Sequence, residues 1–266
     1  MDSTLLSTAL HLALVGSAAV VGMMFALWLL HLGLNNASVV DPGWAFGLAL
    51  LGSIYAALGP GLALRRALVA GMALFWGVRL GLHLVRRIWG EPEEGRYQQL
   101  RRQWRSNVAL KFLAFFQGQA LLDIILSLPF LIACLNPAPE LSWLEYAGVA
   151  LWAVAVLGEA VADAQLDAFK KNPANRGKVC QAGLWNYSRH PNYFFEWLIW
   201  VAWATFALAS PYGWAGLLCP LLMFYFLFKL TGIPATEAQS LRSRGDAYRE
   251  YQRTTSAFVP WFKPPV

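Results

Sequence analysis

Residues 7–34 read STALHLALVGSAAVVGMMFALWLLHLGL, a stretch without a single Asp, Glu, Lys or Arg. An α-helix of about 20 such residues crosses the hydrocarbon core of a bilayer. The rest of the chain has the same character, because 58% of its 266 residues are hydrophobic, only 14% are charged and 13 are tryptophan. This composition excludes an ordinary soluble domain and predicts an integral membrane protein.

Further apolar stretches follow the first. They are long continuous runs and not ten-residue alternations, so they predict helices and not barrel strands. We therefore predict an all-α integral membrane protein with about seven transmembrane helices in one bundle, at residues 7–34, 43–60, 63–86, 109–135, 143–166, 192–210 and 213–232. The polar gaps at 87–108 and 167–190 are short, and no linker or repeat interrupts the chain. A single membrane domain over residues 1–266 is the simplest interpretation.

The basic residues predict the topology. They gather after the third helix, after the fifth helix and in the tail: Arg86, Arg87, Arg96, Arg101, Arg102, Arg105, Lys111; Lys170, Lys171, Arg176, Lys178, Arg189; Arg242, Arg244, Arg249, Arg253, Lys263. By the positive-inside rule these three segments are cytoplasmic. The N-terminus is then outside and the C-terminal tail 233–266 is cytoplasmic. Arg65 and Arg66 are exceptions, since they fall on the opposite side.

Charge and cysteine content exclude several classes of function. The net charge of +6 comes from cations beside predicted membrane helices, which indicates contact with membrane lipid and not with nucleic acid. Cys134, Cys180 and Cys219 are far apart in the sequence, so neither a disulfide framework nor a metal site is predicted. No glycine-rich dinucleotide fingerprint or Walker loop is present. A nucleotide would therefore have to bind among membrane helices.

The richest candidate for chemistry is residues 183–196, which read GLWNYSRHPNYFFE directly before and into the sixth helix. Asn192 and Glu196 lie one turn apart on one face of that helix. A carboxylate at membrane depth is costly and indicates a functional site by default. The structural alternative is an interfacial motif that places Arg189 and His190 at the lipid headgroups.

The fifth helix carries Glu159, Asp163 and Asp167 at successive i, i+4 positions. Carboxylates in a row repel one another. They are tolerated if they face a wet cavity, accept hydrogen bonds from a ligand, or pair with a cation such as Lys170. We predict that Glu159 and Asp163 line a cavity, whereas a solvated helix end is the alternative.

Asp41 at the start of the second helix is a second candidate. Its expected counterparts are Arg79 and His83, which share one face of the third helix. A buried ion pair of this kind is often structural. The sharper hypothesis is a proton-donating pair of Asp41 and His83, because a carboxyl or imidazole in low dielectric can hold a proton near neutrality.

Four segments together resemble the bacterial branch of the steroid 5-alpha-reductase family: residues 41–44 (DPGW), 79–83 (RLGLH), 183–196 and 251–261 (YQRTTSAFVPW). The likeness covers nearly the whole chain. It implies a seven-helix membrane fold that binds NADPH in a cavity facing the cytoplasm. It also implies hydride transfer to a carbon–carbon double bond conjugated to a ketone.

The resemblance also implies roles for individual residues. The side chains that would hold NADPH are Glu159, Asp163, Lys170, Lys178, Arg189, His190, Asn192, Tyr193, Glu196, Glu237 and Arg96. Of these, Lys170, Lys178 and Arg96 occur where family members place basic groups near the phosphates. Asp41, together with His83, would polarise or protonate the ketone, and no metal is implied. Eukaryotic members carry a tyrosine directly after the histidine of the third helix, where this chain has Leu84. The donor to the ketone would then be Asp41, His83 or a tyrosine from elsewhere.

Two other functions stay open. The chain is also similar to isoprenylcysteine carboxyl methyltransferases, which bind S-adenosylmethionine, at residues 189–193, Glu237, Tyr248, Tyr251 and Pro260. It lacks the two adjacent glutamates of their later motif. A lipid-binding or transport protein without chemistry is the third interpretation. For the reductase we expect a lipophilic enone or enoyl lipid as substrate, in a bacterial inner membrane, or in the endoplasmic reticulum if the source is eukaryotic. The sequence does not predict an oligomeric state.

Overall fold

The computed structural model describes residues 3–104, 106–230 and 232–263, and in these ranges the chain is helical without any β-strand. It divides into two compact units, which are described separately. Unit 1 comprises Met1–Ser142 and Ala207–Ala215, and unit 2 comprises Trp143–Phe206 and Gly216–Val266. Of the segments predicted above, residues 1–2 of the domain, residue 105 of the first basic cluster, residue 231 of the last helix and residues 264–266 of the tail lie outside the described residues.

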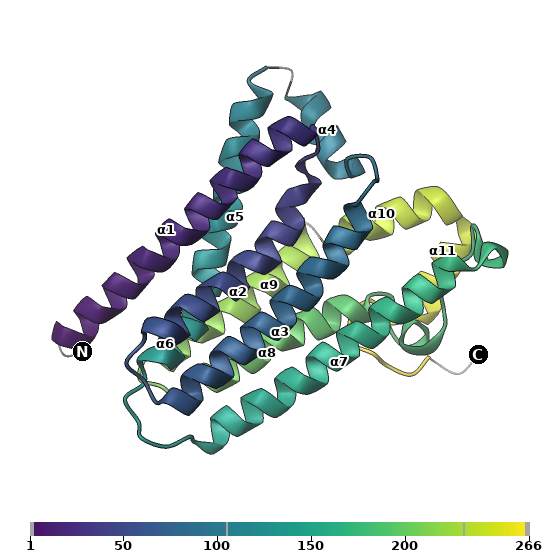
Figure 1. Cartoon of the computed structure of the whole chain (residues 1–266). Coiled ribbons are helices and arrows are strands. Elements are labelled where there is room, and N and C mark those ends of the chain that lie inside the picture. Colours follow the sequence, from purple (N-terminus) through teal and green to yellow (C-terminus); the bar gives the residue numbers. More distant parts are fainter. Residues whose placement is uncertain (1–2, 105, 231, 264–266) are drawn as a thin grey trace. The chain divides into compact units, whose positions relative to one another are not determined.

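Unit 1 contains the helices that precede Ser142: α1 (Ser3–Leu34), η1 (Ala37–Val39), α2 (Val40–Leu58), α3 (Ala63–Ile88), α4 (Gly95–Gln103), α5 (Val108–Leu126) and α6 (Leu128–Leu135). The α2–α3 hairpin forms its most extensive helix pair, and α1 runs along α5 and α2 (Figure 1). The close approach of α2 and α3 requires a small residue. A Cβ atom on Gly77 would lie 2.6 Å from the carbonyl oxygen of Ala45. Membrane helices use small residues at such crossings because packing, rather than water exclusion, holds them together.

Arg65 is fully buried in unit 1 and serves as a cap. Its guanidinium donates to the carbonyl oxygens of Asn136 at 3.0 Å, Ala138 at 2.9 Å and Glu140 at 2.7 Å. Arg66 similarly donates to the carbonyls of Gly61 and Ala56 near the end of α2. Both cations therefore satisfy carbonyls where helices end. This explains why they occur at the end of the helices where the positive-inside rule does not expect them.

Unit 2 is built from α7 (Trp143–Lys171), η2 (Pro173–Asn175), η3 (Gly183–Asn186), α8 (Pro191–Ala207), α9 (Leu218–Tyr225), the π-helix η5 (Phe226–Leu230), α10 (Ile233–Arg244) and α11 (Asp246–Thr254). The short helix η4 (Gly213–Leu217) precedes α9. The predicted span at 213–232 is thus a succession of helix types and not one regular α-helix.

The prediction of an all-α multi-pass membrane protein is confirmed. Six helical segments among the described residues are long and apolar enough to cross a membrane: Ser3–Leu34, Ala37–Leu58, Ala63–Ile88, Val108–Leu135, Trp143–Lys171 and Gly213–Arg244. The sixth predicted span, at 192–210, corresponds to α8, which has 17 residues and is not among these six segments. At 1.5 Å per residue it is about 25 Å long, slightly shorter than the hydrocarbon core. The predicted helix at 109–135 is divided at Ser127 into α5 and α6, where Pro129 begins the new helix.

Candidate functional site

Polar side chains of α7 and α8 meet in unit 2. The amide of Asn192 donates to Asp163 Oδ1 at 3.3 Å. A Cβ atom added to Gly158 would lie 2.4 Å from the ring of Phe195, so the two helices are also in close contact one turn away. Glu159 precedes Asp163 by one turn and is buried, while Glu196 follows Asn192 by one turn. The structure therefore brings Asp163 and Asn192 into contact, and Glu159 and Glu196 each lie one helical turn from this contact on their own helix.

The start of α8 positions these groups. Pro191 is its first residue, where a missing N–H has no cost. The side-chain oxygen of Asn192 accepts from the N–H of Tyr193 at 3.0 Å, which fixes the amide so that its nitrogen can reach Asp163. Deeper in the helix, Trp200 Nε1 donates to Glu196 Oε1 at 3.1 Å. Asn192 and Glu196 are both half-buried, so a ligand can still contact them.

Arg189 and Glu237 form the centre of a second polar network. Arg189 Nε donates to Glu237 Oε1 at 2.7 Å, and Arg189 Nη1 donates to the carbonyls of Gln252 at 2.9 Å and Thr255 at 2.6 Å. Gln252 Nε2 donates to the other carboxylate oxygen of Glu237 at 2.7 Å. The side chains of Arg189 and Glu237 are only 11% and 15% exposed. These groups hold the segment before α8 against α10 and α11.

His190 and Tyr193 extend this network towards α8. His190 Nε2 lies 3.3 Å from Glu237 Oε1, and its ring stacks on Tyr193 with 5.3 Å between the ring centroids. The Tyr193 hydroxyl lies 3.2 Å from Thr236 Oγ1 of α10. His190 is buried in contact with Glu237 and with the ring of Tyr193.

Residues 256–261 of the C-terminal segment hold residues 187–189 in place by hydrogen bonds. The N–H of Arg189 donates to the Ser256 carbonyl at 2.8 Å, and the N–H of Trp261 donates to the Tyr187 carbonyl at 2.9 Å. Ser188 Oγ donates to the Phe258 carbonyl at 2.8 Å. Phe258 packs with Leu227 and Ile233 in a hydrophobic cluster that also contacts the aromatic side chains of α8. Residues 187–189 and residues 256–261, about 70 residues apart in the sequence, therefore together fix the backbone just before α8.

The predicted phosphate-binding cations lie at the polar end of α7. Lys170 is at the end of the helix and Lys178 is in the following connection, and both are exposed. Arg244 Nε donates to the Lys178 carbonyl at 2.9 Å, which ties the backbone of this connection to α10. Gly183 closes this connection with a φ of +57°, and a Cβ atom there would lie 2.3 Å from the side chain of Gln165. Only glycine fits this conformation and this contact.

Asp41 is the centre of a separate cluster in unit 1, but its partners are not the predicted ones. Tyr97 of α4 donates its hydroxyl hydrogen to Asp41 Oδ1 at 2.5 Å, and Arg96 contacts Asp41 Oδ2. Arg87 lies 3.9 Å from the same oxygen. Among the described residues His83 makes no hydrogen bond to Asp41, so the predicted pair of Asp41 and His83 is not formed.

This cluster also changes the role of Arg96. Its guanidinium is held by Asp41 and by Glu94 at 3.3 Å, and it lies 4.7 Å from the centre of the Tyr97 ring. These contacts do not fit the predicted contact with a cofactor phosphate. Burial of Tyr97 and the charge of Asp41 raise the pKa of the Tyr97 phenol well above its ordinary value, so the phenol is protonated.

Sequence reasoning missed Tyr97, Gln252 and Thr236. Tyr97 follows a turn at Gly90, which predicts where α4 begins but not that α4 reaches Asp41. Gln252 and Thr236 carry no signal beyond being polar residues in the tail. Each gains significance only through a partner at least 15 residues away in sequence.

The comparisons with known proteins show the family of the chain. No curated protein and no solved structure matches it. Residues 27–255 match a family described as "Protein of unknown function (DUF1295)", which is associated with steroid 5-alpha-reductase-like proteins. Because this match covers most of the chain, the protein belongs to the DUF1295 family.

Proposed function

We propose that this protein is a membrane-embedded NADPH-dependent reductase that acts on the conjugated double bond of a lipophilic enone or enoyl lipid. The observation that carries the proposal is the strip of Glu159, Asp163, Asn192 and Glu196 where α7 and α8 meet. The resemblance to steroid 5-alpha-reductases connects this strip to the nicotinamide nucleotide. The family match is compatible with that connection.

The chemistry of the donor set fits NADPH. Carboxylates accept hydrogen bonds from ribose hydroxyls and from the nicotinamide carboxamide, and Asn192 can both donate and accept. Lys170 and Lys178 are exposed cations in the same unit and suit the phosphates. When bound, NADPH supplies a hydride to a carbon of the substrate. Arg189, Glu237 and His190 act as positioning residues, because their polar atoms are engaged with one another and with α10 and α11.

The carbonyl end of the substrate is assigned to the Asp41 cluster. Asp41 accepts hydrogen bonds from the Tyr97 hydroxyl and from the Arg96 guanidinium, so it fixes where these two groups lie. Tyr97 is the neutral donor of the cluster and provides the phenol that Leu84 does not. In this proposal the Tyr97 hydroxyl turns away from Asp41 when substrate binds, and it then donates its one hydrogen bond to the oxygen that becomes negative as the double bond is reduced. Asp41 and Arg96 position Tyr97.

Replacing Glu196 with alanine tests the cofactor assignment. A lost hydrogen bond to a charged group costs about 1.5–3 kcal/mol, so the Kd for NADPH should rise roughly 10- to 150-fold. Titration of detergent-purified protein with NADPH, followed by thermal stabilisation, measures this. The control is Glu140→Ala, which removes an exposed carboxylate of unit 1. Unchanged NADPH affinity in Glu196→Ala would exclude the assignment.

The same titration with S-adenosylmethionine tests the methyltransferase. The methyltransferase remains an alternative because Arg189, His190 and Glu237 contact one another. These residues belong to the segments that resemble isoprenylcysteine carboxyl methyltransferases. Stabilisation by S-adenosylmethionine alone would replace the reductase with a methyltransferase. Stabilisation by neither compound would favour the lipid-binding protein.

Tyr97→Phe tests the carbonyl assignment separately. The substitution keeps the ring that packs edge-on against Phe115 and removes only the hydroxyl. We expect kcat for a 3-oxo-4-ene steroid or related enone to fall by roughly 100-fold, with the affinity for NADPH unchanged. Tyr187→Phe, which alters a partly exposed tyrosine of unit 2, is the control and should keep its rate. A Tyr97→Phe variant with normal kcat would remove Tyr97 from the mechanism.

A further inference from the structure

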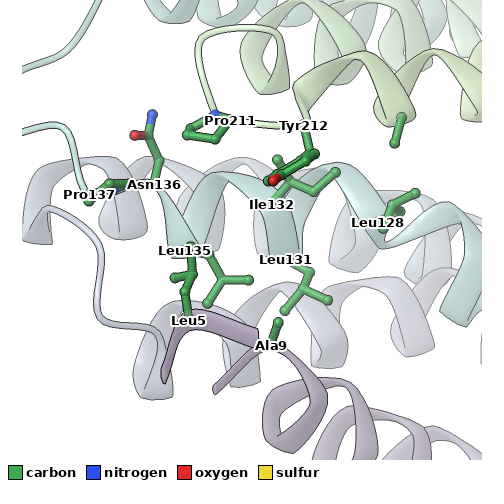
Figure 2. Close-up of a pocket in the computed structure, with 11 residues that line it drawn as sticks. Leu5, Ala9, Leu128, Leu131, Ile132, Leu135, Asn136, Pro137, Pro211 and Tyr212 are labelled. Carbon is green, nitrogen blue, oxygen red and sulfur yellow. The ribbon is translucent and has the colours of Figure 1, made fainter. Parts of the chain in front are cut away.

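Unit 1 contains an apolar cavity of about 370 Å³ that the proposed reaction does not use. Figure 2 shows Leu5 and Ala9 of α1 on one side of it, Pro211 and Tyr212 on the other, and the side chains of α6, including Leu131 and Ile132, between them. Its volume lies in the range of sites that bind small molecules, roughly 300–1,000 Å³. The cavity is large enough for a ligand and not only for a water molecule.

The wall of the cavity offers almost no polar partner. Asn136 is the one amide side chain among its lining residues, and both ends of that amide are used: the nitrogen donates to the Ala209 carbonyl, and the oxygen accepts from the N–H of Ala138. Tyr212 is 51% exposed at the edge of the cavity. A ligand inside it must therefore be a hydrocarbon, and any polar part of that ligand must lie near Tyr212.

The cavity is continuous with the surface that faces lipid. Leu5 and Ala9 line it, while Leu6 and Leu10, the next residues of α1, are 44% and 57% exposed on an apolar helix that crosses the membrane. Tyr212 lines the cavity, and Trp214, two residues further along the chain, is 68% exposed. Such aromatic side chains are typical of the level where acyl chains meet headgroups.

The cavity is also far from the Asp41 cluster. Ala9 is in the first turns of α1, whereas Asn36, just beyond the end of that helix, contacts the carbonyl of Glu91 in the connection before α4. The two ends are roughly 40 Å apart along the helix axis at 1.5 Å per residue. A ligand in the cavity therefore does not occupy the position proposed for the substrate carbonyl.

We propose that this cavity binds one acyl chain of a membrane phospholipid, with the headgroup end of that lipid beside Tyr212. The lipid enters from the bilayer next to Leu6 and Leu10 and fills space that would otherwise lack packing partners. It binds at the end of unit 1 that the charge pattern predicts to be extracytoplasmic. The site is independent of the reductase proposal, since neither needs the other.

A photoreactive phospholipid tests this site. The full-length protein is reconstituted with a phosphatidylcholine that carries a diazirine on one acyl chain, illuminated and digested, and the labelled peptides are identified by mass spectrometry. We expect label on residues 128–137 of the wild type. Ala9→Trp fills the cavity from α1 and should lower this label roughly tenfold, the change produced by about 1.4 kcal/mol. Ala215→Trp fills it from the opposite side and should do the same.

The matched control is Leu14→Trp, which adds the same side chain at a 69% exposed position of α1 outside the cavity. It should leave the label unchanged. Equal labelling in the wild type, Ala9→Trp and Ala215→Trp would overturn the proposal. Labelling by a diazirine fatty acid but not by the phospholipid would also overturn it, because the occupant would then be a free single-chain amphiphile.

Discussion

Arg65→Met is expected to lower the free energy of unfolding by about 3–5 kcal/mol. Arg65 is 0% exposed and donates to the carbonyls of Asn136, Ala138 and Glu140. Methionine fills much of the same volume but donates nothing. Water can reach the exposed Glu140, whereas Asn136 is buried and would keep an unsatisfied carbonyl. The midpoint of thermal unfolding in detergent should fall by on the order of 10 °C.

The control for Arg65 is Arg102→Met in α4. It makes the same chemical change at an exposed arginine of unit 1, and its unfolding midpoint should stay at the wild-type value. Arg65→Lys keeps the charge but loses the fork that reaches several carbonyls, so an intermediate loss is expected. If the Arg65→Met and Arg102→Met variants had the same unfolding midpoint, Arg65 would not be the cap that its contacts indicate.

Arg65 also shows why the sequence predicted the helices but not all of their ends. Hydropathy identifies apolar stretches because their length must match the bilayer, and this is sufficient for α1, α2, α3 and α7. It does not register a break such as the one at Ser127, since both sides of the break are apolar. The positive-inside rule treats cations as facing water. It has no means of recognising an arginine that is buried against carbonyls.

The candidate site was predictable where it depends on local periodicity. Glu159 and Asp163, like Asn192 and Glu196, are four residues apart, so each pair had to share a helix face. The two faces meet at Asp163 and Asn192, whereas the cavity expected for Glu159 and Asp163 stays a prediction. Asp41 was recognised because a carboxylate occurs at the start of a predicted membrane helix.

The partners of these residues were not predictable, because they depend on tertiary structure. Asp41 had plausible cations at Arg79 and His83 on the neighbouring helix, yet Arg96 and Tyr97 approach it from a short helix 55 residues further along the chain. The cation that pairs with Asp41 is determined by how the connection after α3 turns back over α2. Hydrogen bonds from Glu94 N to Ser38 Oγ and from Ala37 N to Glu93 fix that path. None of them has a sequence signature.

Arg189 and Glu237 illustrate the same limit and carry the second large effect. Arg189→Met should lower the free energy of unfolding by about 3–5 kcal/mol, since it leaves the mostly buried Glu237 without its strongest partner and frees the carbonyls of Gln252 and Thr255. Denaturation by SDS titration in mixed micelles measures this. The control is Arg253→Met, whose pair with Glu250 is exposed and should contribute nothing measurable.

A double-mutant cycle decides whether Arg189 and Glu237 act as one unit. If they do, Arg189→Met combined with Glu237→Leu should cost less than the sum of the two single changes, because the second substitution removes the charge that the first one leaves unpaired. We expect a coupling of about 1.5 kcal/mol or more. Additive losses would mean that the carbonyl contacts of Arg189, and not its ion pair, hold the entry to α8. In that case Glu237 would not be needed to position Arg189, and its carboxylate would again be a candidate for direct contact with the cofactor.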